Sequence, residues 1–317
     1  MAEHPSLFVA VTDYDWYQLH ASKDSVDEVN FWRPSSSANF KALDQGGLFL
    51  FKLHSPLNFI VGGGFFAKFL QIPLSLAWES FGDANGTRTI EEMRSHISKY
   101  RQVKISPGDD PSIGCIILAE PFFFPKPDWI PAPPDFATNI VAGKRYRTDT
   151  ESGHHLWHEV VQRLQIHRQR SASAGPALVA AAEARRYGGP AMVMPRLGQG
   201  AFRLLVTDAY SRRCAMTNER TLPVLEAAHI RPYATGGKHE LSNGLLLRSD
   251  LHRLFDHGYI TVDPEEQCIV VSKRIREEFE NGRDYYQLHG RRIASPSDQL
   301  AHPSQESLRF HAETVFR

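Results

Sequence analysis

Short apolar runs separated by glycine and proline dominate the first 130 residues of the chain, and this pattern is typical of β-strands. Four such runs predict strands, at residues 7–11, 47–53, 59–66 and 113–118. Helices are predicted at 74–81 and 89–100, where Thr89 can cap the first turn with Glu92 three residues later, as in a capping box. Because strands outnumber helices, we expect a small curved sheet or barrel closed by helices.

A proline-rich stretch separates this pattern from the rest of the chain. Six prolines lie between Pro121 and Pro134, and they exclude a regular helix or a central strand, so the core of the first domain is expected to end there. Apolar residues at helical spacing predict an amphipathic helix over 153–170. The resulting prediction has three parts: a first domain at 1–135, a helical connector at 136–195 and a second domain at 196–317.

The composition is that of an ordinary globular protein. The 317 residues are 42% hydrophobic and 23% charged, with 36 basic and 36 acidic side chains, which suits two domains with a core each. No apolar run is long enough to span a membrane and the N-terminus has no signal-peptide pattern, so we expect a cytoplasmic protein. Only three cysteines occur, without a C-x-x-C pair, so any metal must be held by His, Asp, Glu or Asn.

The neutral overall charge hides an asymmetry between the two halves. Residues 1–140 carry 16 acidic and 11 basic side chains, whereas residues 185–253 carry 11 basic and 5 acidic ones. Phosphate attraction scales with local positive charge. A polyanion is therefore expected to meet the second region first, although a mildly basic stretch is also typical of a plain solvated surface.

Three residues of the second domain have side chains suited to phosphodiester cleavage. The pattern there predicts a helix at 200–210, then strand, loop, strand and helix, which place His229 on a strand, Asn243 in an Asn-Gly turn and His252 on a helix. A neutral imidazole takes a proton from water near pH 7, and a divalent cation offsets charge on the phosphate. Taken singly, each residue also fits a structural role, as a packed histidine or a turn asparagine.

The segment from about 196 to 262 resembles the HNH nucleases, which have a ββα-metal fold. The resemblance rests on Leu-Glu-Ala-Ala-His-Ile-x-Pro around His229 and on Asn-Gly-Leu-Leu-Leu followed by His-x-Leu-Phe-Asp around Asn243 and His252. It implies that His229 is the general base, that Asn243 braces the loop and orients that histidine, and that His252 is a metal ligand. It also implies hydrolysis that leaves a 5′-phosphate and a 3′-hydroxyl.

One position departs from the pattern of many HNH nucleases. The residue before the base, often a metal ligand, is here Ala228. Glu226, on the same strand, and Asp256, one helical turn after His252, are the candidate replacements. Carboxylates favour Mg²⁺ or Mn²⁺, whereas an imidazole-rich site would also accept Zn²⁺ or Ni²⁺; we favour Mg²⁺.

Basic side chains near these motifs are candidates for binding the DNA backbone. Guanidinium groups bind phosphate through two parallel hydrogen bonds. The candidates for phosphate contact are Arg196, Arg203, Arg231 and Arg248.

Aromatic residues of the first domain are candidates for a modified-base pocket. Enzymes that inspect a base extrude it and stack it between aromatic faces, and the candidate rings are Tyr14, Trp16, Trp32 and Trp78. Each ring also fits a packed core, which is the commoner position of an aromatic residue. The stretches around Trp16 and Trp32 and the glycine-rich strand 61–66 resemble a PUA-superfamily barrel of the EVE or SRA-like kind. Such domains joined to HNH modules imply a modification-dependent restriction enzyme that cuts DNA carrying modified cytosine.

We therefore expect an α+β protein with an N-terminal PUA-like β-barrel and a C-terminal ββα-metal HNH domain that cleaves double-stranded DNA. Cutting both strands needs two active sites, so a homodimer is expected. Two other functions remain open from the sequence. They are a non-cleaving reader of modified nucleic acid with a degenerate HNH domain, and a nuclease that acts on RNA or unmodified DNA.

Overall fold

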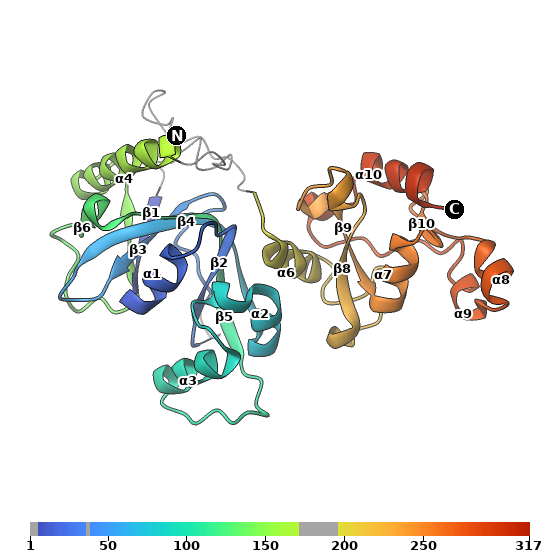
Figure 1. Ribbon diagram of the computed structural model, residues 1–317, viewed down its shortest axis with the longest axis horizontal. Coiled ribbons are helices and arrows are strands. Elements are labelled where there is room, and N and C mark those ends of the chain that lie inside the picture. Colours follow the sequence, from blue (N-terminus) through green and yellow to red (C-terminus); the bar gives the residue numbers. More distant parts are fainter. Residues whose placement is uncertain (1–5, 36–38, 171–195) are drawn as a thin grey trace. The chain divides into compact units, whose positions relative to one another are not determined.

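The computed structural model describes residues 6–35, 39–170 and 196–317, and these fold as two compact units, 1–198 and 199–317 (Figure 1). The first unit therefore extends past the expected boundary at 135. The part of the predicted connector at 171–195 lies outside the described residues. No helix in the described part of the chain is long and apolar enough to cross a lipid bilayer.

The first unit is built on one sheet of seven strands. Its strands are β1 (Ser6–Thr12), β2 (Glu28–Arg33), β3 (Leu48–Leu53), β4 (Phe59–Pro73), β5 (Ser112–Phe123), β6 (Ile130–Pro131) and β7 (Gly143–Arg147). The strand order is β2-β5-β4-β3-β1-β7, with β6 paired to β4. β1 and β3 run parallel, and every other pair in the sheet is antiparallel. Among the described residues β2 and β7 leave the sheet open at its two ends, so the expected barrel is not closed.

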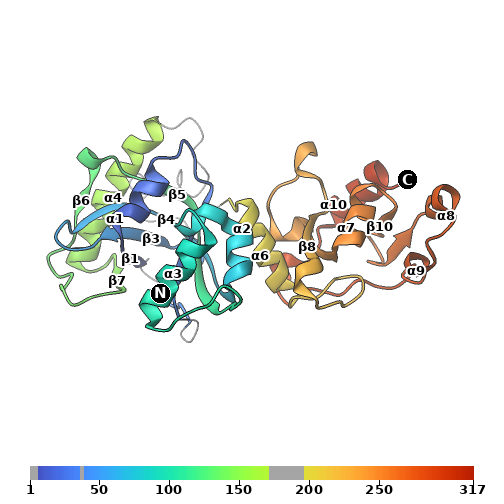
Figure 2. The same cartoon turned by 60° about the horizontal axis from the view of Figure 1, so that its bottom comes forward.

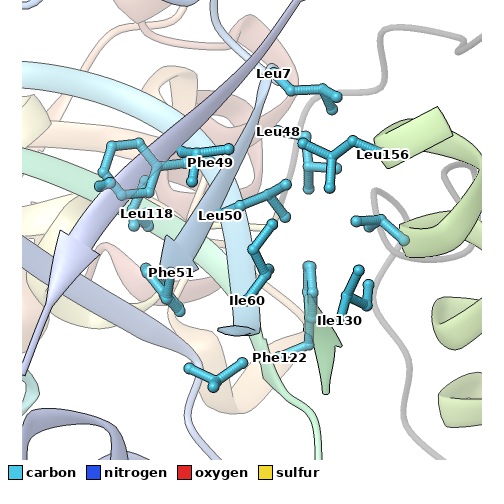
Figure 3. Close-up of a cluster of buried hydrophobic side chains, with 14 of the residues drawn as sticks. Leu7, Leu48, Phe49, Leu50, Phe51, Ile60, Leu118, Phe122, Ile130 and Leu156 are labelled. Carbon is cyan, nitrogen blue, oxygen red and sulfur yellow. The ribbon is translucent and has the colours of Figure 1, made fainter. Parts of the chain in front are cut away.

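The apolar runs of the first unit form strands whose side chains are buried in its core. All six residues of β3 are buried, as expected for a central strand covered on both faces. Figure 3 shows Leu50 of β3 beside Ile60 of β4 and Phe122 of β5 within one apolar cluster. Leu156 joins this cluster from helix α4 (Glu151–Arg170), whose apolar stripe packs onto the sheet. The amphipathic helix predicted for 153–170 is thus part of the first core.

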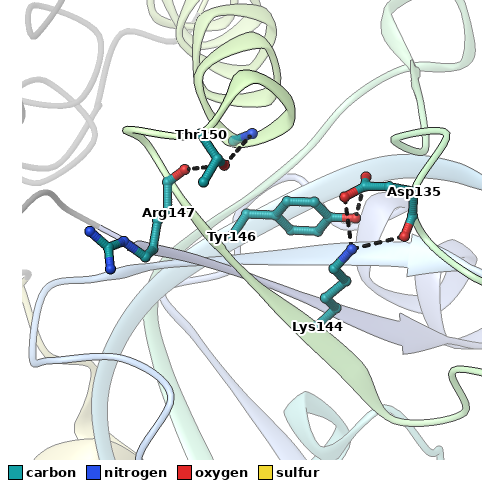
Figure 4. A network of polar contacts seen from close by, with 6 residues as sticks. Asp135, Lys144, Tyr146, Arg147 and Thr150 are labelled. Carbon is teal, nitrogen blue, oxygen red and sulfur yellow. Dashed lines mark hydrogen bonds and ion pairs between the residues drawn. The ribbon is translucent and has the colours of Figure 1, made fainter.

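Polar contacts join β7 to the turn before it and to helix α4 after it (Figure 4). Lys144 donates to the carboxylate of Asp135 at 2.8 Å, and the hydroxyl of Tyr146 donates to the same carboxylate at 3.1 Å. Thr150 then begins α4, because its hydroxyl donates to the Arg147 carbonyl at 2.8 Å and accepts from the Gly153 N–H at 3.3 Å. Residues 135–153 therefore belong structurally to the first unit.

Three further helices of this unit are α1 (Tyr14–Ala21), α2 (Leu74–Phe81) and α3 (Ile90–Arg101). α3 begins as predicted, because the Thr89 side chain accepts a hydrogen bond from the Glu92 N–H at 3.1 Å. The prediction that the proline-rich stretch excludes a central strand was wrong at Pro121, because this residue lies in β5, which is an internal strand of the sheet. Its pairing with β4 shifts register between Gly63 and Phe65, opposite Pro121, and such a bulge tolerates a residue without an N–H.

The second unit has the order helix, strand, strand, helix at its start. α6 (Gln199–Ala209) precedes β8 (Leu225–His229), β9 (Gly244–Arg248) and α7 (Ser249–Asp256). β8 and β9 form an antiparallel pair. The remaining elements are the β10 (Ile260–Val262) and β11 (Ile269–Val271) pair and the helices α8 (Arg274–Phe279), α9 (Arg283–Tyr286) and α10 (Gln305–Phe310). Figure 2 shows α6, β8, α7 and β10 of this unit in a second view.

The C-terminal segment packs against α7, the helix that carries some of the candidate catalytic residues. His311 is buried and stacks on Phe255 of α7, with ring centroids 3.6 Å apart. Its Nε2–H donates to the Phe255 carbonyl at 3.0 Å, and its Nδ1 accepts from the Thr261 hydroxyl at 2.8 Å. Burial lowers the pKa of His311 to about 4. The imidazole is therefore neutral at pH 7 and acts as a structural link.

Candidate active site

The loop between β8 and β9 is closed by Asn243. Its side-chain oxygen accepts the Arg231 N–H at 2.8 Å, and its amide donates to the carbonyls of Arg231 at 3.0 Å and Lys238 at 3.1 Å. The Asn243 carbonyl also accepts the Ile230 N–H at 2.9 Å. With its side chain buried and fully engaged, Asn243 braces the loop that follows His229. Its carboxamide is committed to the backbone and is not a free metal ligand.

We expect Asn243→Ala to lower the free energy of unfolding of the second unit by about 3 kcal/mol, because three part-buried backbone groups lose their partner. All five tryptophans lie before residue 158, so tryptophan fluorescence reports only the first unit. When urea unfolding is followed by circular dichroism, the second unit of Asn243→Ala should unfold at a lower urea concentration than in the wild type. The midpoint of unfolding measured by tryptophan fluorescence should not change. The matched control is Asn281→Ala at an exposed site; equal midpoints for the two variants would contradict the bracing role.

His229 ends β8 in a partly buried, mainly aromatic environment. Its ring stacks on Phe202 of α6, with centroids 4.1 Å apart and planes at 8°. Its cross-strand partner is Gly244, where a Cβ would lie 2.5 Å from the side chain of Val206, so only glycine fits beside the histidine. Burial lowers the pKa of His229 to about 4, with further contributions from the charges of His239 and His252. His229 is therefore neutral at pH 7 and able to accept a proton.

His252 lies on α7 between two carboxylates. Its Nδ1 donates to Glu226 of β8 at 2.6 Å, and its Nε2 lies 3.3 Å from Asp256. Burial raises the pKa of Asp256 above its ordinary value. Strand β8 and helix α7 thus bring together the three residues proposed as metal ligands. No hydrogen bond or ion pair joins His252 to His229 among the described contacts.

The Nε2 side of the His252 ring, which faces a carboxylate, suits a divalent cation. With a proton on Nδ1, the lone pair of Nε2 faces a carboxylate oxygen, so a proton or a cation must lie between them. His252 and Asp256 would offer such a cation one nitrogen and one oxygen donor, and Mg²⁺ is commonly bound in proteins through one or two carboxylates. Within the described residues, however, no three His, Cys, Asp or Glu side chains are arranged to hold a metal.

Glu226 is placed as the partner that orients His252. A carboxylate on the second nitrogen fixes the tautomer and the direction of a ligating imidazole. The position before His229 is the completely buried Ala228. Its methyl group cannot bind a metal, so this position does not complete the ligand set. His252 and Asp256 are the two residues whose free donor atoms suit the cation, and water or a phosphate oxygen would supply the rest.

One residue close to His229 was absent from the candidates chosen from the sequence. His239 lies in the loop between β8 and β9, and its Nδ1 is 3.0 Å from Nε2 of His229. The two histidines are ten positions apart in the sequence, and no helical or strand periodicity connects them. Their contact depends on the closure of the loop by Asn243, which sequence spacing alone does not reveal.

A comparison with known protein families finds a match within the second unit. Residues 214–263 match the family model described as HNH endonuclease. This segment is an HNH endonuclease domain. No curated protein matches the chain. HNH nucleases generally use a divalent metal.

The solved structures that match the chain include the following two. One is the mutant ZmASCH protein from Zymomonas mobilis, at 10% identity and a TM-score of 0.29, covering 47% of this chain and 95% of that one. The other is described as a modification dependent TagI restriction endonuclease, at 12% identity and a TM-score of 0.27, covering 96% of this chain and 81% of that one.

Two of the arginines proposed for phosphate contact are held within the second unit by other residues. Arg248 forms a two-pronged ion pair with Asp250, with both N–O distances at 2.7 Å. Arg231 donates to the Thr235 carbonyl at 3.1 Å and lies over the ring of Phe310. Both must exchange these partners to bind a phosphate with the whole guanidinium group.

The other two arginines lie on either side of the boundary between the units. Arg203 is half-buried on α6. Arg196 belongs to the first unit, where its N–H donates to Glu120 at 2.7 Å. Their role in binding DNA remains a prediction.

The structure brings two of the four proposed base-pocket rings to one segment. The Trp32 Nε1–H donates to the Asn85 carbonyl at 2.9 Å, and the indole of Trp16 lies so close to Gly86 that a Cβ there would be 1.9 Å away. Trp16 also packs edge-on against Phe51, with centroids 4.8 Å apart. Both indoles therefore line the segment 82–86.

The remaining two rings lie elsewhere in the first unit. Tyr14 is 41% exposed on α1 and makes an edge contact with Trp129, at a centroid distance of 6.4 Å. Trp78 is half-buried on α2. Among the described residues, Tyr14 offers the most accessible of the four rings for stacking.

Proposed function

We propose that the protein is a metal-dependent DNA endonuclease in which the first unit reads a modified base and the HNH domain hydrolyses the phosphodiester bond. The observation that carries this proposal is a neutral imidazole, His229, in the same ββα element as the His252–Asp256 donor pair. A base that activates water and a cation that offsets phosphate charge are two components that enzymes use to hydrolyse a phosphodiester. The basic charge of residues 185–253 suits a polyanionic substrate.

In this mechanism His229 takes a proton from the attacking water. Its pKa of about 4 keeps the ring neutral at pH 7, and stacking on Phe202 fixes the plane of the ring. His252 and Asp256 would hold the divalent cation, which when bound offsets negative charge on the scissile phosphate. Glu226 keeps Nε2 of His252 directed away from β8 by accepting the Nδ1 proton.

Reading of a modified cytosine is proposed for the first unit. An extruded base needs an aromatic face on which to stack. Tyr14 supplies an exposed ring, and Trp16 and Trp32 adjoin the segment 82–86. Because each HNH domain holds one His229, cleavage of both strands requires two copies, and we propose a homodimer on the DNA.

A panel of DNA substrates tests the proposal directly. Plasmids of one sequence carrying plain, 5-methyl or 5-hydroxymethyl cytosine are incubated with the full chain and Mg²⁺ or Mn²⁺. We expect nicked and linear products from a modified plasmid at least about tenfold faster than from the plain one, equivalent to about 1.4 kcal/mol of discrimination. EDTA should abolish cleavage.

The same panel separates the alternatives. Binding of modified DNA without cleavage by any metal would favour a reader with an inactive HNH domain, as the alanine at position 228 suggests. Equal cleavage of plain and modified plasmids, or faster cleavage of a matched RNA, would overturn the modified-base proposal.

A further inference from the structure

His239 and His229 form a pair of imidazoles, each supported by its own aromatic ring. Nδ1 of His239 and Nε2 of His229 are 3.0 Å apart, and the two ring planes cross at 61°. His239 stacks on Tyr233, with centroids 4.8 Å apart, in the way that His229 stacks on Phe202. A contact of this length between ring nitrogens requires one of them to carry the shared proton.

The position of that proton decides whether His229 can act as a base. If Nε2 of His229 carries it and His239 accepts, the lone pair of a neutral His229 lies on Nδ1 and is free to receive a proton from water. If Nδ1 of His239 carries it and donates, the proton of a neutral His229 occupies Nδ1 instead. In that second arrangement both nitrogens of His229 are blocked.

We propose that His239 is a positioning residue for catalysis, which accepts the Nε2–H of His229 and so leaves Nδ1 of His229 as the atom that deprotonates water. This inference rests on the proposed nuclease function. It assigns to a second histidine the task of fixing both the tautomer and the direction of the base, because the stack on Tyr233 holds the accepting nitrogen in place.

An O–H bond of water breaks and its proton joins Nδ1 of His229, while the oxygen forms a bond to phosphorus. The bond between phosphorus and the 3′ oxygen breaks, that oxygen takes a proton from solvent water, and the hydroxide so formed is later neutralised by the proton that His229 releases. His229 is then a cation whose Nε2–H still donates to His239, and a charged donor makes this hydrogen bond stronger than it was before.

Two substitutions of His239 test this role by kinetics. His239→Leu removes the acceptor, whereas His239→Asn keeps an amide oxygen near the position of Nδ1. On the plasmid that the wild type cleaves, we expect His239→Leu to lower kcat by about 10- to 100-fold at unchanged KM. His239→Asn should retain kcat within a few fold of the wild type, and His302→Leu, at an exposed histidine, should match the wild type.

The kinetic proposal is overturned if His239→Leu folds and keeps the wild-type kcat. It is overturned equally if His239→Asn is as slow as His239→Leu, because a packing role would not distinguish acceptor from non-acceptor. Should His239→Leu fail to fold by circular dichroism, the comparison passes to His239→Asn and to the direct measurement of the tautomer.

The tautomer is measured without metal or substrate. Long-range nitrogen–proton correlation spectra of protein labelled with ¹⁵N-histidine identify which ring nitrogen carries the proton, with His229→Ala used for assignment. We expect Nε2–H for His229 in the wild type and in His239→Asn. A wild-type His229 protonated on Nδ1 overturns the role of His239, whereas Nε2–H in a protein that cleaves no nucleic acid supports the pair and counts against the proposed function alone.

Discussion

Replacing His229 with alanine should lower the rate of cleavage by about 10²- to 10⁴-fold, the usual contribution of a general base. The reason is that His229 is the neutral imidazole at the end of β8, with a pKa lowered to about 4. Nicking of supercoiled plasmid under single-turnover conditions measures the loss. DNA binding, measured by fluorescence anisotropy in Ca²⁺, should change little because the arginines proposed for phosphate contact remain.

The control for this variant is His302→Ala, which removes an exposed histidine of the same unit. It should cleave at the wild-type rate. If His229→Ala instead bound DNA as poorly as it cleaved it, His229 would have a structural role in the loop, and the assignment of the base would be withdrawn.

The second large effect is expected at His252. His252→Ala removes the imidazole whose Nε2 faces Asp256, and loss of the cation forfeits several kcal/mol of transition-state stabilisation. We therefore expect about 10³-fold slower cleavage at a metal concentration that saturates the wild type, since each 1.4 kcal/mol is tenfold. Titration calorimetry with Mn²⁺ should show that the binding isotherm is lost.

Glu226→Gln provides the comparison that separates a ligand from an orienting residue. A glutamine can still accept the Nδ1–H of His252, so we expect Mn²⁺ to bind with an affinity reduced by only about tenfold. Loss of Mn²⁺ binding as complete as in His252→Ala would show that Glu226 is itself a ligand.

Local pattern was enough to predict most of the elements that carry chemistry. The pattern places His229 on a strand, Asn243 in a loop and His252 on a helix. These positions follow from the stretch at 225–230, the Asn-Gly pair and the helix after residue 249. The helix start at Thr89 also followed from a short-range rule, because a cap depends on neighbours three residues away.

Features that depend on distant partners were not predictable in this way. β7 has only one buried side chain, Tyr146, so its sequence lacks an apolar pattern, and it is a strand because β1 pairs with it. β2 is similarly defined by its pairing with β5. The contact between His239 and His229 arises from loop closure, and the open sheet from strand order, neither of which is encoded in a local period.

The stack of Phe202 on His229 and of His311 on Phe255 sets a practical limit for anyone transplanting this nuclease. A chimaera made from residues 214–263 alone would carry every recognisable motif but would lack one ring from upstream and one from downstream. The proposed base on β8 and the proposed metal-binding helix α7 would each lose the ring against which they pack. Grafts onto DNA-binding domains should therefore take residues 199–317 as the exchangeable segment.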